Sequence, residues 1–388
     1  VTIGVFLKRM SALTILEDKR TFFVRFNKAF LFGWAFVVVC GCGSSEERVI
    51  AKQNIVHQGD TQGTTYVIKY HGADSVDQRI IEEVLEQVDV EFNLWRPDSR
   101  INAVNAFKSD QTVFSFDDSN RLWSVLWDKC LEMHSASEGA FDPTVHPLVE
   151  LWGFGLKNKT SVAREDVERI LPHVGMTTDR IDLDEVEEGR IYQRTHVRKG
   201  DRETSVDFNA IAQGMTVDLL GDALVEHGVT DYMVEVGGEV KCMGVRNDGQ
   251  PWRIAIDRPV DSAWGERPLQ VVVNVQDAAI CTSGNYRKFH EVDGVKRSHT
   301  ISPFTGYPVT HALLSVTIKA VDASTADALA TACMVWGPVR GRSFIKEYRD
   351  NHPEEAIEAY FISAAENDTH VYWETEGWNQ ALLPEDQL

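Results

Sequence analysis

The stretch from Ser298 to Thr331 constrains the fold of this chain most, because it places an ionisable side chain, a tight turn, a strand and a helix in direct succession. His299 can exchange a proton near neutral pH. Residues Ser302 to Gly306 predict a turn, since proline presets φ and glycine tolerates a positive φ. The alternating residues Leu313 to Lys319 predict a strand, and Ala323 to Thr331 begins a helix.

Asp327 and Thr331 are spaced in that helix so that both side chains lie on one face. A carboxylate and a hydroxyl on one face suit a hard cation such as Mg²⁺. The same spacing also fits a surface helix with an exposed aspartate and a hydrogen-bonded threonine. The segment alone leaves both interpretations open.

The acidic composition narrows the classes of function. The chain has 388 residues and a formal net charge of -20, which argues against general binding to nucleic acid, because that binding needs a basic surface. A single polyphosphate ligand held through a metal ion is still compatible with this charge. Cys130, Cys242, Cys281 and Cys333 are isolated and form no C-x-x-C pair, so we expect neither a zinc site nor a disulfide framework.

The N-terminal residues have the order of a secretory signal. Basic residues between Lys19 and Lys28 precede an apolar run from Ala29 to Val39, which is short for a membrane span. The following V-C-G-C resembles a lipoprotein cleavage box with Cys42 as the lipidated residue. A plain signal peptide or a membrane anchor is the alternative. The sequence thus predicts a signal peptide over 1–41, a lipidated N-terminus and tether over 42–56 and a folded domain over 57–388.

The rest of the chain mixes helical and extended patterns without a strict βαβ rhythm. Hydrophobic periodicity predicts helices over Val76–Phe92 and Asp117–Glu138, a short strand over Ser205–Phe208 and a helix from there to about His227. Extended segments are predicted at Asp231–Glu235, Glu239–Met243, Trp252–Ile256 and Leu269–Val275, with a loop at Leu94–Asn102 and a polar turn at Ile280–Tyr286. We therefore expect an α+β fold in one compact domain, with largely antiparallel sheets and packed helices. Neither a Rossmann fingerprint nor a P-loop is present in the sequence.

Irregular, glycine-bearing segments are the candidates for a binding site. Gly139 to Gly155 combines glycines, prolines and large apolar residues, as is typical of a packed functional loop. The bend between Phe208 and Gly214 would expose backbone groups that serve a cation or phosphates. Trp95 heads a proline-broken loop, where it either stacks on a flat ligand or anchors the loop.

Six motifs occur in a fixed order: G-A-F-D-P-T-V-x-P-L-V-x-L-W-G-F-G, V-D-F-N-A-I-A-Q-G, V-E-V-G-G-E, T-S-G-N-Y, S-H-T-I-S-P-F-T-G and A-D-A-L-A-T. Together they resemble the bacterial FAD:protein FMN transferases, once called thiamine-biosynthesis lipoproteins. The resemblance runs from about Gln62 to the C-terminus. It implies an enzyme that splits FAD, releases AMP and attaches FMN through its phosphate to a threonine of an acceptor flavoprotein, which could belong to a membrane redox complex.

The resemblance also implies particular site residues. Mg²⁺ would be held by the main-chain carbonyl of Ala210 and by the side chains of Asp327 and Thr331. FAD contacts would fall on Gln62, Trp95, Ala140, Phe141, Asp142, Asp207, Gln213 and Ile301. His299 matches the S-H motif and is the candidate general base, with positioning of a phosphate or of the turn as the alternative. Many members are lipid-anchored outside the cytoplasm, so the resemblance places this chain on the extracytoplasmic (periplasmic) side of a membrane in the cell envelope.

The chain departs from the family pattern at several of these positions. Gln62 replaces a usual Met, Trp95 a usual Tyr and Ser302 a usual Asp, and Gln213 stands where a charged residue is common. Ala330 takes the place of a second Asp found in some members, so the metal site has one carboxylate fewer.

Two other functions fit the same motifs. One is an Mg²⁺-dependent FAD pyrophosphatase, and the other is a lipid-anchored flavin-binding protein without enzymatic activity. Asp327 and Thr331 argue against the second, because flavin storage needs no metal at the pyrophosphate. Product analysis separates the three: FMN on protein, free FMN or unchanged FAD.

The lipoprotein hypothesis predicts a mature chain that starts at a lipid-modified Cys42. The expected result is a mass that fits cleavage before Cys42 plus the lipid. Mass spectrometry of the membrane-extracted protein measures it. An unmodified chain that starts elsewhere, or an uncleaved N-terminus, contradicts the hypothesis.

Overall fold

The computed structural model describes residues 54–380 and 382, apart from 109–111, 156–160, 189–191, 260–268, 286–288, 293–294, 367–368 and 381. Contacts divide the chain into Val1–Ile50 and Ala51–Leu388, and every described residue belongs to the second unit. The predicted signal peptide and Cys42 lie outside the described residues. The first strand begins at Ile55, so the end of the segment predicted as a tether is part of the sheet.

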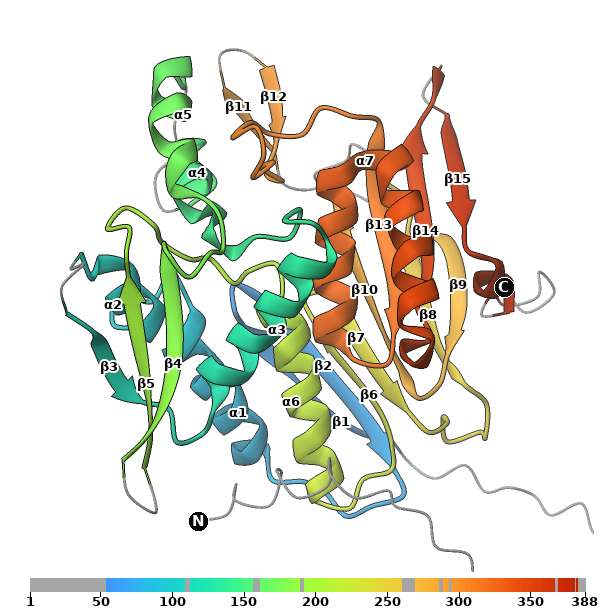
Figure 1. Cartoon of the computed structure of the whole chain (residues 1–388). Helices are drawn as coiled ribbons and strands as arrows, with labels where there is room; N and C mark the ends of the chain where they lie inside the picture. Colours follow the sequence, from blue (N-terminus) through green and yellow to red (C-terminus); the bar gives the residue numbers. More distant parts are fainter. Residues whose placement is uncertain are drawn as a thin grey trace, which may run out of the picture. The chain divides into compact units, whose positions relative to one another are not determined.

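An eight-stranded sheet, antiparallel at every pairing, forms the centre of this unit (Figure 1). This bears out the predicted α+β class with antiparallel sheets. In spatial order the strands are β1 (Ile55–Thr61), β2 (Thr64–His71), β6 (Asp231–Val236), β7 (Glu239–Met243), β10 (Ala278–Gly284), β13 (Leu313–Ala320), β14 (Glu358–Ala364) and β15 (His370–Glu374).

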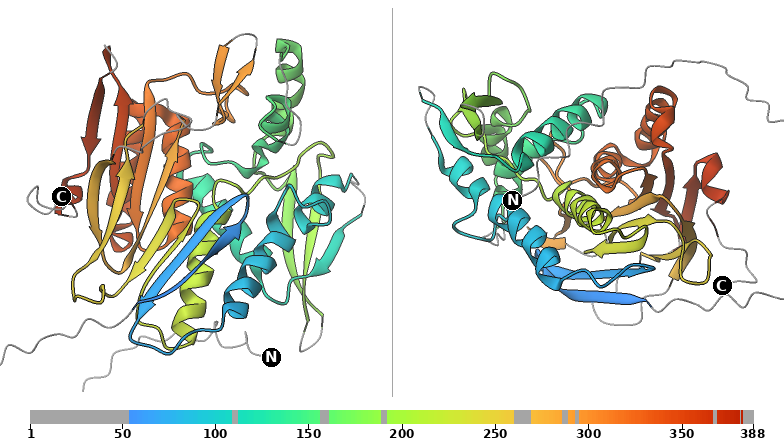
Figure 2. Two further views of the ribbon diagram at one scale, coloured as in Figure 1. Left: turned by 180° about the vertical axis from the view of Figure 1, so that it is seen from behind. Right: turned by 90° about the horizontal axis from the view of Figure 1, so that it is seen from below.

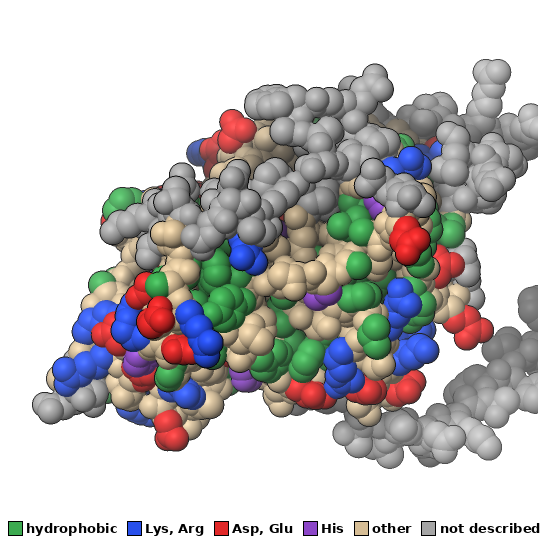
Figure 3. Space-filling view, turned by 90° about the horizontal axis from the view of Figure 1, so that it is seen from above, with side chains coloured by type: hydrophobic (Ala, Val, Ile, Leu, Met, Phe, Trp, Pro, Cys, Tyr) green, Lys and Arg blue, Asp and Glu red, His purple; other side chains and the backbone are tan. Residues whose placement is uncertain are grey.

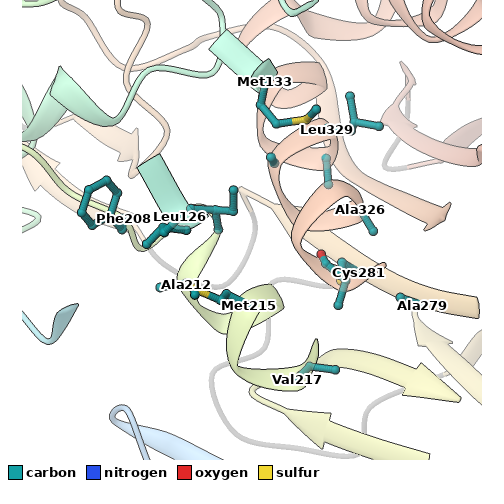
Figure 4. Packing of buried hydrophobic residues seen from close by; sticks show 14 of the residues in the cluster. Leu126, Met133, Phe208, Ala212, Met215, Val217, Ala279, Cys281, Ala326 and Leu329 are labelled. Carbon is teal, nitrogen blue, oxygen red and sulfur yellow. The ribbon is translucent and has the colours of Figure 1, made fainter. Parts of the chain in front are cut away.

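Helices cover one face of the sheet (Figure 2). Buried residues of α6 (Ala212–Glu226) and α7 (Ala323–Asn351) pack against the sheet, and α1 (Gln78–Phe92) and α3 (Leu122–Ala136) share the same hydrophobic core. In the close-up, Met215 of α6, Leu329 of α7 and Met133 of α3 belong to this one cluster (Figure 4). Among the described residues, no helix is both long and apolar enough to cross a membrane.

The opposite face of the sheet has a core of its own. Along β10, Ala279 and Cys281 belong to the helix-covered core, whereas Ala278 and Ile280 belong to a second cluster, as strand alternation requires. The hairpin of β8 (Trp252–Asp257) and β9 (Leu269–Val275) packs on this second cluster. The strand is therefore buried on both sides.

Smaller elements surround the large sheet. A three-stranded sheet pairs β3 (Phe114–Asp117), β5 (Tyr192–Lys199) and β4 (Ile181–Glu188), and β11 (Phe289–Val292) pairs with β12 (Val295–Ser298). The remaining helices are α2 (Arg100–Ala106), α4 (His146–Leu151) and α5 (Arg164–Ile170), with single 3-10 turns η2 (Pro143–Val145), η3 (Leu171–His173), η4 (Pro353–Glu355) and η6 (Glu376–Gln380).

The structure corrects several local predictions. The segment predicted as a polar turn at Ile280–Tyr286 is mostly the central strand β10. Ser205–Phe208 is not a strand, because its backbone bonds to loops instead: Val206 N–H donates to Asn105 Oδ1 at 2.8 Å, and Asp207 N–H donates to Pro143 O at 2.8 Å. The predicted loop at Leu94–Asn102 already contains the start of α2 at Arg100.

The α3 boundary was also predicted too early. The helix begins at Leu122 rather than at Asp117, because Asp117 ends β3. Asp118 lies three residues before the N-cap Arg121, and its carboxylate accepts hydrogen bonds from the first-turn N–H groups of Trp123 at 3.1 Å and Ser124 at 3.0 Å.

Helices α6 and α7 approach each other closely at Gly214. A Cβ at this position would lie 2.5 Å from the carbonyl oxygen of Ala323 in α7, which is too short for real atoms. The N–H of Gly214 donates a hydrogen bond to Oδ2 of Asp327 at 3.2 Å. Only glycine permits this spacing, so the residue fixes where Asp327 lies.

Gly214→Ala is expected to lower the free energy of unfolding by about 1–3 kcal/mol, because the added methyl group forces α6 away from α7. Urea denaturation measures the change. Val225→Ala, on the exposed side of the same helix, serves as the control and is expected to change stability by no more than about 0.5 kcal/mol. Equal effects of the two substitutions would show that the close approach at Gly214 does not matter.

Candidate flavin and metal site

One cavity of about 1100 Å³ collects residues from distant parts of the chain. It is bounded by the tips of two hairpins, by the segments before α4 and α6, by α7 and by the turn after β12. Every described residue predicted for the site lines it: Gln62, Trp95, Ala140, Phe141, Asp142, Asp207, Ala210, Gln213, His299, Ile301, Asp327 and Thr331. The structure thus brings the candidates together, while their individual roles remain predictions.

Two tight hairpin turns form one side of the cavity. Gln62 and Gly63 join β1 to β2 with φ of 49° and 70°, and Gly237 and Gly238 join β6 to β7 with φ of 66° and 114°. Such left-handed pairs match the twist of antiparallel strands. Gln62 is held in place, because its Nε2 donates to Thr216 Oγ1 of α6 at 2.7 Å.

Gln213 and Trp95 complete this part of the lining. Gln213 Nε2 lies so close to Gly237 that a Cβ there would be 2.8 Å away, so the glycine makes room for the amide. Trp95 is 57% exposed. Much of its ring is therefore available to stack on a flat ligand, and this role stays a prediction.

Asp327, Thr331 and Ala210, the residues predicted to hold a metal ion, line another side of the cavity. Asp327 is only 5% exposed, and its burial raises the pKa of the carboxyl to about 7, against the opposing hydrogen bond from Gly214 N–H. Thr331 Oγ1 lies 3.1 Å from Ser283 Oγ of β10. This burial rules out the plain surface helix considered for Asp327.

These oxygens fit a magnesium ion. Mg²⁺ prefers hard oxygen ligands and often takes only one carboxylate from the protein, with water and substrate phosphates completing its shell. Among the described residues, no three His, Cys, Asp or Glu side chains gather as a metal cluster. Ala330 is buried beside Asp327 and adds no ligand.

His299 lines the cavity. It follows the last residue of β12 and precedes a turn that is held by several hydrogen bonds. Its ring meets the edge of Phe154 with the centroids 6.4 Å apart. Next to it, Thr300 Oγ1 donates to Asn285 Oδ1 at 2.8 Å. Ser302 shapes the turn through its backbone, because its N–H donates to Tyr307 O at 2.9 Å and its carbonyl accepts from Gly306 N–H at 2.8 Å.

Asp142 and Asp207 belong to the loop side of the cavity. Asp142 caps η2, since its Oδ1 accepts from Thr144 N–H at 2.8 Å and from Thr144 Oγ1 at 2.5 Å. Burial raises the pKa of both carboxyls; the Thr144 hydroxyl opposes this shift for Asp142, and His146 opposes it for Asp207. The backbone bond from Asp207 to Pro143 joins the two segments.

The cavity also contains residues that the sequence did not single out. His146 lines it, and its Nδ1 lies 2.8 Å from Ser205 Oγ. Burial lowers the pKa of this imidazole, although Asp207 opposes the shift. The only feature of the sequence that pointed to His146 is its position between Pro143 and Pro147, in the loop predicted to be functional. Other lining residues to which the sequence assigned no role are Glu235, Arg253, Asp257 and Ser283.

Seen from above, hydrophobic and histidine side chains occupy the middle of the described surface, and charged side chains gather toward its edges (Figure 3). The apolar residues that line the cavity suit a ligand with a flat apolar part, and the hydrogen-bonding groups and oxygen atoms inside it suit a polar part.

The chain belongs to the ApbE family, whose model matches residues 62–358. It is 37% identical over 313 residues to a FAD:protein FMN transferase of Vibrio cholerae, covering 79% of this chain and 87% of the relative. It is 29% identical over 368 residues to a FAD:protein FMN transferase of Escherichia coli, covering 92% and 97%.

Solved structures agree in fold. The flavin transferase ApbE from Vibrio cholerae superimposes with a TM-score of 0.70 at 30% identity, covering 85% of this chain and 100% of that one. The apo flavinyl transferase ApbE of Pseudomonas stutzeri gives 0.70 at 30% identity, covering 85% and 97%. The family predicted from the motifs is thereby confirmed.

The metal-free protein should show a pH-dependent stability that Asp327→Asn removes. The folded-state pKa of about 7 lies above the ordinary value of 3.8, so stability falls as pH rises from about 4 to about 7, by up to about 1.4 kcal/mol per pH unit. Urea denaturation in chelator should find the variant more stable than wild type at pH 8, with a smaller difference at pH 5. A difference independent of pH contradicts the burial argument.

Proposed function

We infer that this chain is a FAD:protein FMN transferase, an enzyme that moves FMN from FAD to an acceptor flavoprotein. The observation that carries this conclusion is the convergence of the family's motif residues on one cavity. Relatives that share most of the chain's length have this activity by name.

The reaction exchanges one bond to phosphorus for another. The hydroxyl oxygen of an acceptor threonine attacks the phosphorus of the FMN half, the bond from that phosphorus to the bridging oxygen breaks, and AMP leaves with that oxygen. The hydroxyl proton passes to a base. In this proposal His299 is the base, because it lines the cavity and because imidazole is the side chain best suited to accept a proton in general-base catalysis.

Asp327, Thr331 and the carbonyl of Ala210 would hold Mg²⁺. When bound, the ion neutralises charge on the phosphate oxygens of FAD. The burial of Asp327 and the position of Thr331 one helical turn further along α7, with both residues lining the cavity, support this assignment. Trp95 would stack on a ring of FAD, and Gln62 and Gln213 would offer neutral hydrogen bonds where relatives have other side chains.

The attacking hydroxyl is proposed to come from another protein. Ser205 Oγ lies 2.8 Å from His146 Nδ1, but Ser205 does not itself line the cavity, so it is not proposed as the nucleophile. Nothing lies within 4 Å of a Cβ built at Gly238, so the turn at Gly237 and Gly238 leaves space there for an approaching loop. Water can enter the same space, so slow hydrolysis of FAD is expected as a side reaction.

We propose further that the enzyme works at a membrane surface on the extracytoplasmic side. The support is the sequence alone: basic residues, an apolar run and Cys42 in lipoprotein order. The acceptor would then be a flavoprotein exposed on the same side, such as a subunit of a membrane redox complex.

His299→Asn is expected to slow transfer about 10²- to 10⁴-fold while changing FAD affinity little, because a general base acts on the proton rather than on binding. Single-turnover kinetics and FAD titration measure the two effects. His227→Asn, at the exposed end of α6, is the control. Near-normal turnover with weak FAD binding would instead make His299 a positioning residue.

Incubation with FAD, Mg²⁺ and a flavin-accepting domain is expected to release AMP and add the mass of FMN to the acceptor. A Thr→Ala acceptor variant should gain no mass. Intact-mass spectrometry of both acceptors measures the outcome. Free FMN as the main product, with proven acceptors unmodified, would indicate a pyrophosphatase, and unchanged FAD would indicate a binding protein.

A further inference from the structure

A second carboxylate, Asp218, lies behind the proposed metal site without lining the cavity. It belongs to α6, where it follows Gly214 by one turn. Its Oδ1 accepts from the backbone N–H of Ala323 at 3.0 Å, and its Oδ2 accepts from the N–H of Ser324 at 2.9 Å and from Ser324 Oγ at 2.8 Å. Asp218 therefore holds the N-terminus of α7.

Helices α6 and α7 contact each other at two positions that are one helical turn apart on each helix. Gly214 and Asp218 lie on one face of α6, and Ala323 and Asp327 lie on one face of α7. Gly214 bonds to Asp327, and Asp218 bonds to Ala323. The charge of Asp218 is thus fixed about one helical turn from the carboxylate of Asp327, and the two interact electrostatically.

Lys241 of β7 opposes that charge. Its Nζ lies 2.8 Å from Asp218 Oδ1, and both side chains are largely buried, with 14% and 16% of their surfaces exposed. Asp222 is a further carboxylate that interacts with Lys241. Ion pairs shielded from water keep much of their influence on nearby charges, whereas exposed pairs are screened.

We propose that the Asp218–Lys241 pair sets the affinity of the Asp327 site for its divalent cation. The carboxylate of Asp218 attracts the cation and the ammonium of Lys241 repels it. The inference rests on the proposed metal role of Asp327. It gives this chain a means of adjusting metal binding at a site where Ala330 supplies no second carboxylate.

The test is a titration of the folded protein with Mn²⁺. Calorimetry and the electron paramagnetic resonance signal of free Mn²⁺ both measure the dissociation constant. Asp218→Asn is expected to weaken binding about 3- to 10-fold, and Lys241→Met to strengthen it by a similar factor. Both substitutions remove the ion pair but change the charge in opposite directions. Arg349→Met breaks the comparable Arg349–Glu358 pair at the other end of α7 and should leave affinity unchanged.

Thermal unfolding of each variant checks that it is folded, and Lys241→Gln replaces Lys241→Met if the methionine variant is not. If Mn²⁺ affinity changes in the same direction in both variants, the pair acts only by holding α7 in place. If the affinity changes in neither variant, the pair has no role in metal binding. Either result overturns this inference alone. A wild-type protein that binds no Mn²⁺ overturns both this inference and the proposed metal role.

Discussion

The contact between Gly214 and Asp327 determines how the cavity can work. A carboxylate taken out of water is costly unless it is hydrogen-bonded or paired, and Gly214 N–H supplies a hydrogen bond because no side chain keeps α6 away from α7. The sheet beneath the helices fixes their separation, since both pack against its core face. The position of Asp327 is thus a consequence of helix packing rather than of a loop.

A kink in the middle of the same helix positions the turn that follows His299. Gly337 has a φ of 76° and Pro338 has no N–H, so the carbonyl of Met334 loses its helical partner. His311 Nε2 lies 2.7 Å from this carbonyl and replaces the missing donor. Trp336, just before the kink, stacks on Phe304 with the ring centroids 4.9 Å apart. The turn after His299 is thereby attached to the helix that carries Asp327.

Much of the site was predictable from sequence because its residues occur in short motifs. Asp327 and Thr331 have helical spacing, and the glycine pairs mark tight turns, so local chemistry predicts local structure. The β10 strand was missed because its polar end, Thr282 to Gly284, resembles a turn, while its burial on both faces depends on partners far along the chain. The opposite error occurred at Ser205–Phe208, which was predicted to be a strand. Its residues alternate like those of a strand, but its backbone N–H groups bond to loop residues instead of a neighbouring strand.

His146 shows a further limit of sequence reasoning. Its position near Asp207 depends on the joining of two segments through Pro143 and Asp207, and no spacing in the sequence reports that contact. The charge balance of Asp218 and Lys241 likewise arises only when α6, α7 and β7 meet.

The most direct test of this account is a crystal structure with FAD and Mn²⁺, with the ion located by anomalous scattering. The account predicts an anomalous peak within ligand distance of the Asp327 carboxylate, the Thr331 hydroxyl and the Ala210 carbonyl, in contact with the pyrophosphate of FAD. A pyrophosphate bound in the cavity with the ion elsewhere, or with no ion at these oxygens, would contradict it.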